Sequence, residues 1–352
     1  MLFRSELRDF AMGSSTQPLA VVGPPGSGKS AVLAKFVQEW RDQGRTVLPH
    51  FVGASARSTS LRSMLRRICS YLAAIVGSTD RVPDATRDLI DLLRALLARV
   101  PEDAGTVVVI DAIDQFEPID RPFELAWLPG ELPVSVKFVI SCADGTERGR
   151  ATLERIRARA LPILEVPRLT TRERLGIIQR APAVWAKTLD RDQRKALLRN
   201  PATDNPLFLL VAIEELRGFG SYERLKARIE ALPSGNNAIP DLFEQVLERL
   251  EQESGRALAE SILRAIAVAR RGVSEQELCG ALGLDDPGPA YVVLRQLRPY
   301  LAQRGALMTA APTRQILATA AAPQAAARRD DRAARVCAAT SGTTGGSTEV
   351  FR

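Results

Sequence analysis

The chain has 352 residues, 45% of them hydrophobic and 25% charged, which is enough for two or three globular domains. Its four cysteines lie far apart and it has one histidine, so neither a disulfide framework nor a Cys/His zinc site is expected. The formal net charge of +7 permits acidic partners, whereas the absence of a long apolar run or signal peptide predicts a cytoplasmic protein with no membrane partner.

The first elements of the chain enclose a phosphate-binding motif. A short helix is expected over residues 2–10, a strand over 18–22 and a helix from 31 to about 43. Between that strand and helix, Gly23-Pro-Pro-Gly-Ser-Gly-Lys-Ser30 fits G-x-x-x-x-G-K-(S/T) at every fixed position. Glycines let backbone N–H groups turn toward phosphate oxygens, and the following helix adds its partial positive charge. The residues expected to bind nucleotide are Gly23, Pro24, Pro25, Gly26, Ser27, Gly28, Lys29 and Ser30.

Strands and helices then alternate up to about residue 167. Strands are expected over 46–53, 106–110, 134–141 and 163–166, and helices over 61–76, 83–100 and 147–160. The stretch Thr106-Val-Val-Val-Ile110 is a continuous β-branched run, which is typical of a strand buried on both faces of a parallel sheet. The alternation therefore predicts an α/β fold with a parallel sheet.

Carboxylates follow the strand that ends at Ile110. Asp111 lies where open α/β sheets bind ligands, and together with the Ser30 hydroxyl it is the expected holder of Mg²⁺. Asp114 lies one turn further on and can orient an attacking water, as can Glu117. Gln115 can position water but cannot accept its proton, so we expect slow hydrolysis or none. The structural alternatives are a turn-capping role for Asp111 and solvated loop carboxylates for the other two.

Four other features have both a functional and a structural interpretation. Ser141 either contacts the γ-phosphate or simply ends its strand, and Pro206 after Asn205 either approaches the nucleotide or only starts a helix. For His50 we favour packing at a strand end over a role as catalytic base. For the arginines of residues 148–159 we favour a solvated helix face over a groove for nucleic acid.

From residue 170 onward the hydrophobic spacing is helical. Helices are expected over 171–180, 190–199, 206–217, 222–231, 239–253, 257–270, 274–282 and 290–301. Ser274 with Glu277 forms the pattern of a capping box. After about residue 309 large apolar side chains become rare, so residues from 312 on are expected to be disordered and to make no core contacts.

These motifs together resemble the STAND class of signal-transduction ATPases, and in particular the NACHT-type modules of telomerase-associated and nephrocystin-like proteins. The stretches that carry the resemblance are residues 23–30, 50–55 with 58–59, 109–115, and 205–209 running into 214–220, while 272–278 is similar to a winged-helix region. The expected architecture is an AAA+-like P-loop NTPase core (18–167) after an N-terminal helix and linker (1–17). A helical lid (168–235), a winged-helix-like region (236–311) and a tail (312–352) follow.

The resemblance implies a nucleotide-dependent switch. ATP or ADP binds with Mg²⁺ between core and lid, Pro206 approaches the adenine, and the nucleotide state controls self-oligomerisation of an attached effector. Ser141-Cys142 lacks the arginine that many NACHT modules carry there, so γ-phosphate sensing is expected to differ. Effector and sensor domains are not recognisable in this chain, which suggests a fragment or a truncated product. The alternative hypothesis is a DNA-handling AAA+-like ATPase that uses its winged-helix region, although nucleic acid is the less favoured partner.

Overall fold

The computed structural model describes residues 2–55, 57–180, 189–217, 222–269, 272–304 and 307–309. The predicted tail from residue 312 lies outside these residues. The chain divides into two compact units, the first ending at Glu230 and the second beginning at Ala231, and each is described by itself. None of the described helices is long and apolar enough to cross a membrane.

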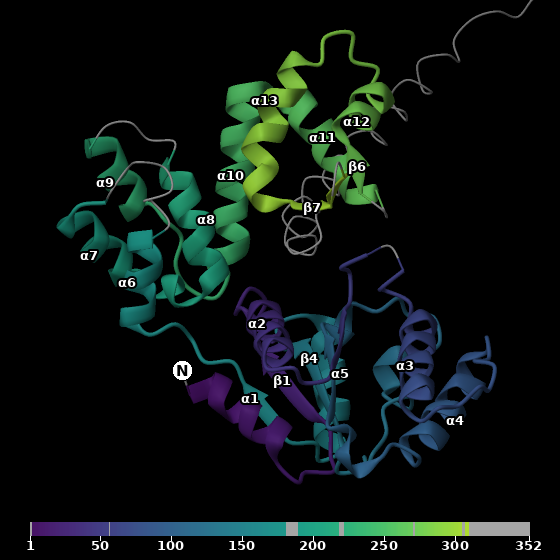
Figure 1. Cartoon of the computed structure of the whole chain (residues 1–352). Helices are drawn as coiled ribbons and strands as arrows, with labels where there is room; N and C mark the ends of the chain where they lie inside the picture. Colours follow the sequence, from purple (N-terminus) through teal and green to yellow (C-terminus); the bar gives the residue numbers. More distant parts are fainter. Residues whose placement is uncertain are drawn as a thin grey trace, which may run out of the picture. The chain divides into compact units, whose positions relative to one another are not determined.

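A five-stranded parallel sheet forms the centre of the first unit (Figure 1). Its strands are β1 (Leu19–Gly23), β2 (Val47–Phe51), β3 (Thr106–Asp111), β4 (Val136–Ala143) and β5 (Ile163–Glu165), in the spatial order β2-β3-β4-β1-β5. All neighbouring pairs are parallel, which confirms the predicted α/β sheet. Since β4 lies between β1 and β3, the carboxyl ends of all three strands meet at one edge of the sheet.

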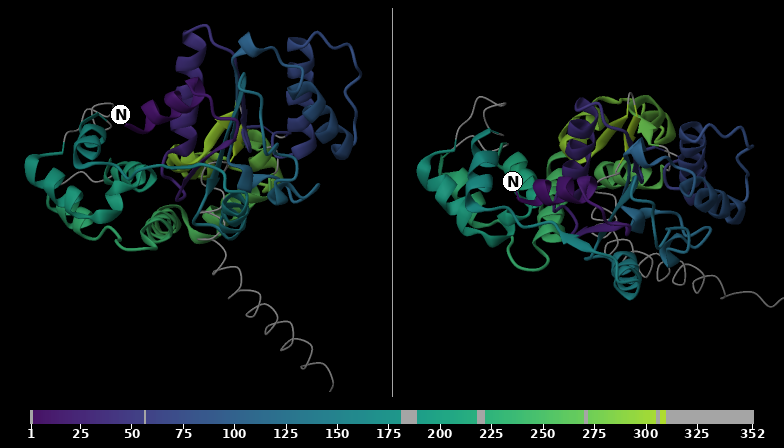
Figure 2. Two further views of the ribbon diagram at one scale, coloured as in Figure 1. Left: turned by 90° about the horizontal axis from the view of Figure 1, so that it is seen from below. Right: turned by 60° about the horizontal axis from the view of Figure 1, so that its bottom comes forward.

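Helices cover both faces of this sheet because alternate residues of each strand point to opposite sides. Val107 and Val109 pack with the helices α1 (Leu2–Met12) and α2 (Lys29–Asp42). Val108 and Ile110 pack with α3 (Leu61–Ile75), α4 (Thr86–Leu97) and α5 (Glu147–Ala158). Helices α3 and α4 lie side by side (Figure 2). The helix predicted over 83–100 is shorter than expected, since it begins at Thr86 and ends at Leu97.

Four further helices complete the first unit and correspond to the predicted lid. They are α6 (Thr171–Arg180), α7 (Arg191–Arg199), α8 (Pro206–Arg217) and α9 (Tyr222–Glu230). Asp190 starts α7 with a capping box closed by Gln193, and a short 3-10 turn, η5 (Pro201–Asp204), leads into α8. These bounds agree with the helical spacing of the sequence.

The second unit combines helices and a small antiparallel sheet in the element order of a winged helix. Its elements are α10 (Ala238–Ser254), α11 (Arg256–Val268), β6 (Val273–Ser274), α12 (Glu275–Ala281), α13 (Gly288–Leu297), β7 (Ala302–Arg304) and β8 (Leu307–Thr309). The three strands form an antiparallel sheet in the order β6-β8-β7, and Ser274 closes the expected capping box. The helix predicted over 290–301 ends earlier, at Leu297, because Pro299 has no N–H for the helical ladder, and the chain continues into β7.

Candidate functional site

The glycine-rich loop between β1 and α2 has a backbone that only glycine adopts without strain. Gly26 has φ +76° and Gly28 has φ +91°, both in the left-handed region. Gly28 is also the N-cap of α2, and it has no side chain to occupy the N–H groups of the first helical turn. The loop therefore curls into α2 and leaves donors of the helix N-terminus for an anion.

Lys29, the first residue of α2, is buried inside this loop. Its Nζ donates to the carbonyl oxygens of Gly23 at 2.6 Å and Pro24 at 3.0 Å. Burial lowers the pKa of Lys29, whereas the carboxylates of Asp114, Asp111 and Asp144 raise it. Burial outweighs the three carboxylates, so the pKa of Lys29 lies below its ordinary value.

Asp111 ends β3 and is held by a chain of hydrogen bonds. The Ser141 hydroxyl donates to Asp111 Oδ1 at 2.5 Å and accepts from the Ala112 N–H at 2.8 Å. The Ser30 hydroxyl also hydrogen-bonds Asp111, so the two residues predicted to hold Mg²⁺ come together. Burial raises the pKa of Asp111, and the hydrogen bonds from Ser141 and Ser30 and the charge of Lys29 counteract that shift.

Asp114 lies in the short turn after β3 and is almost fully buried, with 1% of its surface exposed. Its Oδ1 accepts from the Ala143 N–H at 3.1 Å, while Oδ2 has no hydrogen-bond partner among the described residues. Burial raises the pKa of this carboxyl, and the Lys29 charge opposes that shift. An unpaired buried carboxylate oxygen is costly unless something else binds it, so Asp114 is the stronger candidate to hold a water.

Glu117 and Gln115, which follow Asp114 in this segment, have different surroundings from Asp114. Glu117 accepts a hydrogen bond from the Thr59 hydroxyl at 2.9 Å, so its carboxylate already has a partner on the loop after β2. Gln115 is exposed, and its Oε1 lies 3.5 Å from where a Cβ on Gly53 would be. Among the described residues, neither side chain makes a hydrogen bond to the phosphate loop.

Two of the ambiguous features have clear structural roles. Ser141 is fully buried and its hydroxyl serves Asp111 and Ala112, so it orients the carboxylate at the strand end. His50 is also buried, donates through Nε2 to the Ser58 carbonyl at 2.9 Å, and stacks with Phe116 at a ring distance of 6.1 Å. Because a carbonyl only accepts, Nε2 carries the proton, and His50 has the packing role that the sequence favoured.

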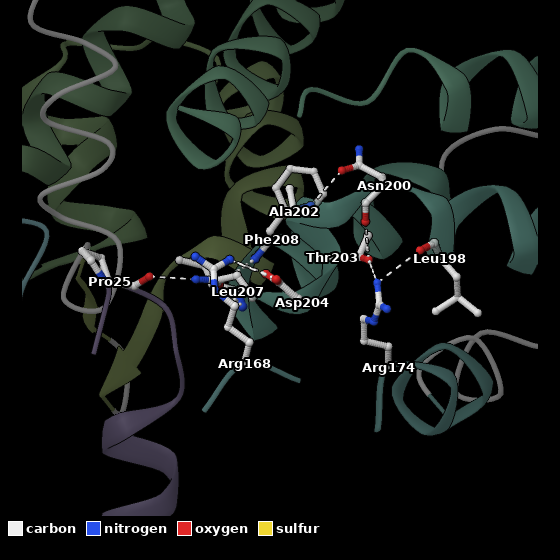
Figure 3. Close-up of polar contacts among 11 residues, drawn as sticks. Pro25, Arg168, Arg174, Leu198, Asn200, Ala202, Thr203, Asp204, Leu207 and Phe208 are labelled. Atoms are coloured by element: carbon white, nitrogen blue, oxygen red, sulfur yellow. Dashed lines mark hydrogen bonds and ion pairs between the residues drawn. The ribbon is translucent and has the colours of Figure 1, made fainter. Parts of the chain in front are cut away.

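The start of α8 lies directly on the phosphate loop (Figure 3). Asn205 Nδ2 donates to the Pro25 carbonyl at 3.0 Å, and its Oδ1 caps α8 by accepting from Leu207 N–H at 2.9 Å. Leu207 N–H also donates to the Gly26 carbonyl at 3.2 Å. A Cβ on Gly26 would lie only 2.5 Å from the Leu207 Cβ, so this approach requires glycine. Sequence reasoning selected the following proline and missed the donor role of Asn205.

Pro206 itself is beside the loop. Its Cγ lies 3.8 Å from where a Cβ on Gly28 would be. The linker after β5 is tied to the same region, because Arg168 donates to both carboxylate oxygens of Asp204 at 2.9 Å (Figure 3). Arg174 donates to the Thr203 hydroxyl at 2.9 Å and thereby links α6 to η5. These contacts fix the segment from which Asn205 reaches the loop.

A glycine-rich loop, a buried lysine in the first helical turn and an aspartate at the end of a parallel strand define this chain as a P-loop NTPase. Residues 2–140 match the family model of the AAA ATPase domain. Among similar proteins, the mouse (Mus musculus) telomerase protein component 1 is 29% identical over 73% of this chain and 10% of its own length. The human (Homo sapiens) NACHT domain- and WD repeat-containing protein 1 is 29% identical over 76% of this chain and 17% of its own, and mouse nephrocystin-3 is 26% identical over 74% and 20%.

The chain is thus similar to NACHT-like P-loop NTPase modules and, over residues 2–140, to the AAA ATPase domain, which confirms the resemblance seen in its sequence. It spans between a tenth and a fifth of the length of these relatives.

The residues at the site fit a nucleotide with Mg²⁺. The left-handed glycines and the α2 N-terminus suit phosphate oxygens, and Lys29 supplies the opposite charge. The Ser30 hydroxyl and the Asp111 carboxylate are oxygen ligands of the kind Mg²⁺ prefers. No group of three or more His, Cys, Asp or Glu side chains in the described part of the chain forms a metal cage, and Mg²⁺ beside phosphates does not need one.

Proposed function

We propose that this module is a nucleotide-dependent switch in signal transduction, which binds ATP or ADP with Mg²⁺ at residues 23–30 and transmits the bound state through the helical lid. The contact between Asn205 and Leu207 on α8 and the Pro25 and Gly26 carbonyls is the observation that carries it. A phosphate bound by the loop would contact the same backbone segment, residues 25 and 26, that the start of α8 contacts. A ligand that changes the loop therefore also changes its contact with the lid, and a ligand that binds one lid arrangement better than another is what a switch requires.

Each side chain of the site has its own role in this proposal. Lys29 neutralises phosphate charge, Ser30 and Asp111 hold the magnesium ion, and Pro206 lies against the nucleotide. Asp114 holds the attacking water and takes its proton at the unpaired Oδ2, and its raised pKa makes it a better base than an exposed aspartate. Gln115 positions water only. Because Gln115 cannot accept a proton from that water, and Asp114 also interacts with the charge of Lys29, we expect turnover to be slow.

The winged-helix arrangement of the second unit supports the alternative of a DNA-handling ATPase. A helix that reads DNA presents several cations to the phosphates. The exposed face of α13 instead carries Tyr291 at 44% and Val292 at 54% exposure together with Arg295. Arg298, just after α13, is paired with Glu275 at 2.9 Å. These observations favour the switch.

The arginines near α5 support the same preference. Arg159 donates to the Leu125 carbonyl at 2.6 Å and the Leu128 carbonyl at 2.8 Å, so it holds a loop of the first unit. Arg148 lies over the Phe123 ring at 5.7 Å from its centroid. A DNA reader should lose affinity steeply between low and physiological salt, whereas a switch without a DNA site should show no binding at physiological salt.

Hydrogen exchange of the lid tests the switch proposal. Addition of ATP and Mg²⁺ should change the exchange of the amides at the start of α8, around Leu207, and leave those of α4 unchanged. The proposal also includes self-oligomerisation, which light scattering on the same samples measures. Its expected partners are effector domains in the cytoplasm. Nucleotide binding without any change in α8 exchange would contradict a switch that works through the lid.

A further inference from the structure

A cavity that shares no residue with the phosphate loop lies in the first unit. Its volume is about 760 Å³, and its walls are residues 49–51 at the end of β2, residues 54, 55, 57 and 58 of the next loop, and one face of α3. The α3 residues are Ser63, Arg66, Arg67 and Ser70, which the helix period places side by side. β2 is the edge strand of the sheet, and none of the residues assigned to the nucleotide site lines this cavity.

The cavity has a strong excess of positive charge. Arg57, Arg66 and Arg67 line it, and no aspartate or glutamate does. Arg66 is paired with Asp84, which lies outside the lining and is largely exposed. Arg57 makes no side-chain hydrogen bond or ion pair with the described part of the chain. Three guanidinium groups gathered in one concavity repel one another, and a bound anion relieves that repulsion.

His50 orients one of these arginines. Its Nε2 donates to the Ser58 carbonyl, so Nδ1 keeps its lone pair and faces Arg67 Nη2 at 3.4 Å. Arg67 also donates to the Pro49 carbonyl. Burial lowers the pKa of His50, so the ring is neutral at pH 7 and acts as an acceptor that fixes the guanidinium of Arg67.

Hydroxyl groups complete the lining, and the loop that carries them is held in place. Ser55 N–H donates to Ser58 Oγ at 2.8 Å and Ser58 Oγ donates to the Ser55 carbonyl at 2.8 Å. The two ends of the loop are tied to the segment after β3, through Val52 N–H to the Asp111 carbonyl at 3.2 Å and Glu117 N–H to the Thr59 carbonyl at 2.9 Å. The walls are thus arranged before any ligand binds, which lowers the entropic cost of binding.

We propose that this cavity binds a small phosphate-bearing anion, as a site separate from the phosphate loop. Guanidinium forks and serine hydroxyls are the donors that recognise phosphate oxygens, and the volume lies within the range of small-molecule sites. A single concavity of this size suits a phosphorylated small molecule, whereas a nucleic acid would need an extended basic surface.

Calorimetric titration of the whole chain with inorganic tripolyphosphate at physiological salt tests the proposal. Lys29→Ala removes the anion site of the loop, while Arg57→Gln and Arg66→Gln each remove one charge from the cavity. Arg150→Gln, at an exposed position of α5, is the matched control for charge loss. Circular dichroism and thermal melts confirm that each variant folds.

Tripolyphosphate should still bind to Lys29→Ala, and within that background each cavity variant should weaken the affinity by roughly tenfold or more while the control leaves it unchanged. Loss of all binding in Lys29→Ala would overturn the proposal, because every bound anion would then belong to the loop. Equal affinities of the cavity variants and the Arg150 control would overturn it as well.

Discussion

Replacing Asn205 by alanine should loosen the attachment of the lid to the phosphate loop. The change removes the bond to the Pro25 carbonyl at 3.0 Å and the capping bonds to Leu207 N–H at 2.9 Å and Phe208 N–H at 3.4 Å. Loss of a helix cap costs about 1 kcal/mol and loss of one further hydrogen bond about 1 kcal/mol, so the free energy of unfolding should fall by about 2 kcal/mol. In a unit of this size that corresponds to a decrease in Tm of roughly 4–8 °C.

Asn205→Ser separates the two contributions. The serine hydroxyl still caps α8, but it is too short to reach the Pro25 carbonyl, so only about half of the loss should remain. Urea titration followed by circular dichroism measures both variants, and hydrogen exchange at the start of α8 shows whether the loss is local. If both variants unfold within about 0.3 kcal/mol of the parent chain, Asn205 does not hold the lid on the loop and the reasoning fails.

Three other substitutions test the carboxylate cluster. Ser141→Ala leaves the buried Ala112 N–H and one Asp111 oxygen without that partner, so the unfolding free energy in urea should fall by about 2–3 kcal/mol, and an unchanged midpoint would refute the assignment. Ala112→Gly relieves a left-handed residue at φ +57° and should raise stability by about 1 kcal/mol, whereas Ala73→Gly in the last turn of α3 should lower it by up to about 1 kcal/mol. Burial raises the folded-state pKa of Asp114 above 3.8, so the stability this group contributes is present at acid pH and lost as pH rises through the folded pKa. Without nucleotide or Mg²⁺, Asp114→Asn should therefore be more stable than the parent chain at pH 7, and thermal melts should show that difference shrinking toward about pH 4.

Most of the fold is visible in the sequence because it depends on local spacing. The β-branched run of residues 106–110 predicts a doubly buried strand, and the phosphate loop is recognisable from the positions of its glycines, lysine and serine. Helix bounds in the lid agree with the period of apolar residues. The short strands β7 and β8 were missed, because three residues such as Ala302-Gln-Arg304 carry little strand preference and pair only in the folded unit.

The contacts that complete the site could not be predicted, because they join distant parts of the chain. Asn205 reaches Pro25 across 180 positions, and its sequence neighbours indicate only a helix cap. Ser141 reaches Asp111 across 30 positions, and either of its two interpretations fits a strand end. Such pairs depend on the order of strands in the sheet and on the packing of the lid, which no local pattern encodes.

Whether this module is governed by nucleotide depends first on Lys29. Calorimetric titration with ATP and Mg²⁺ should show binding to the parent chain and a loss of affinity of roughly a hundredfold or more in Lys29→Ala, since charge-assisted hydrogen bonds contribute about 1.5–3 kcal/mol each. Lys35→Ala removes the same charge from the exposed side of α2, where Lys35 contacts only Gln38 at 3.3 Å among the described residues, and it should bind like the parent. ATP affinity in Lys29→Ala equal to that of the Lys35→Ala control would contradict the assignment of the loop as the nucleotide site and, with it, the proposed switch.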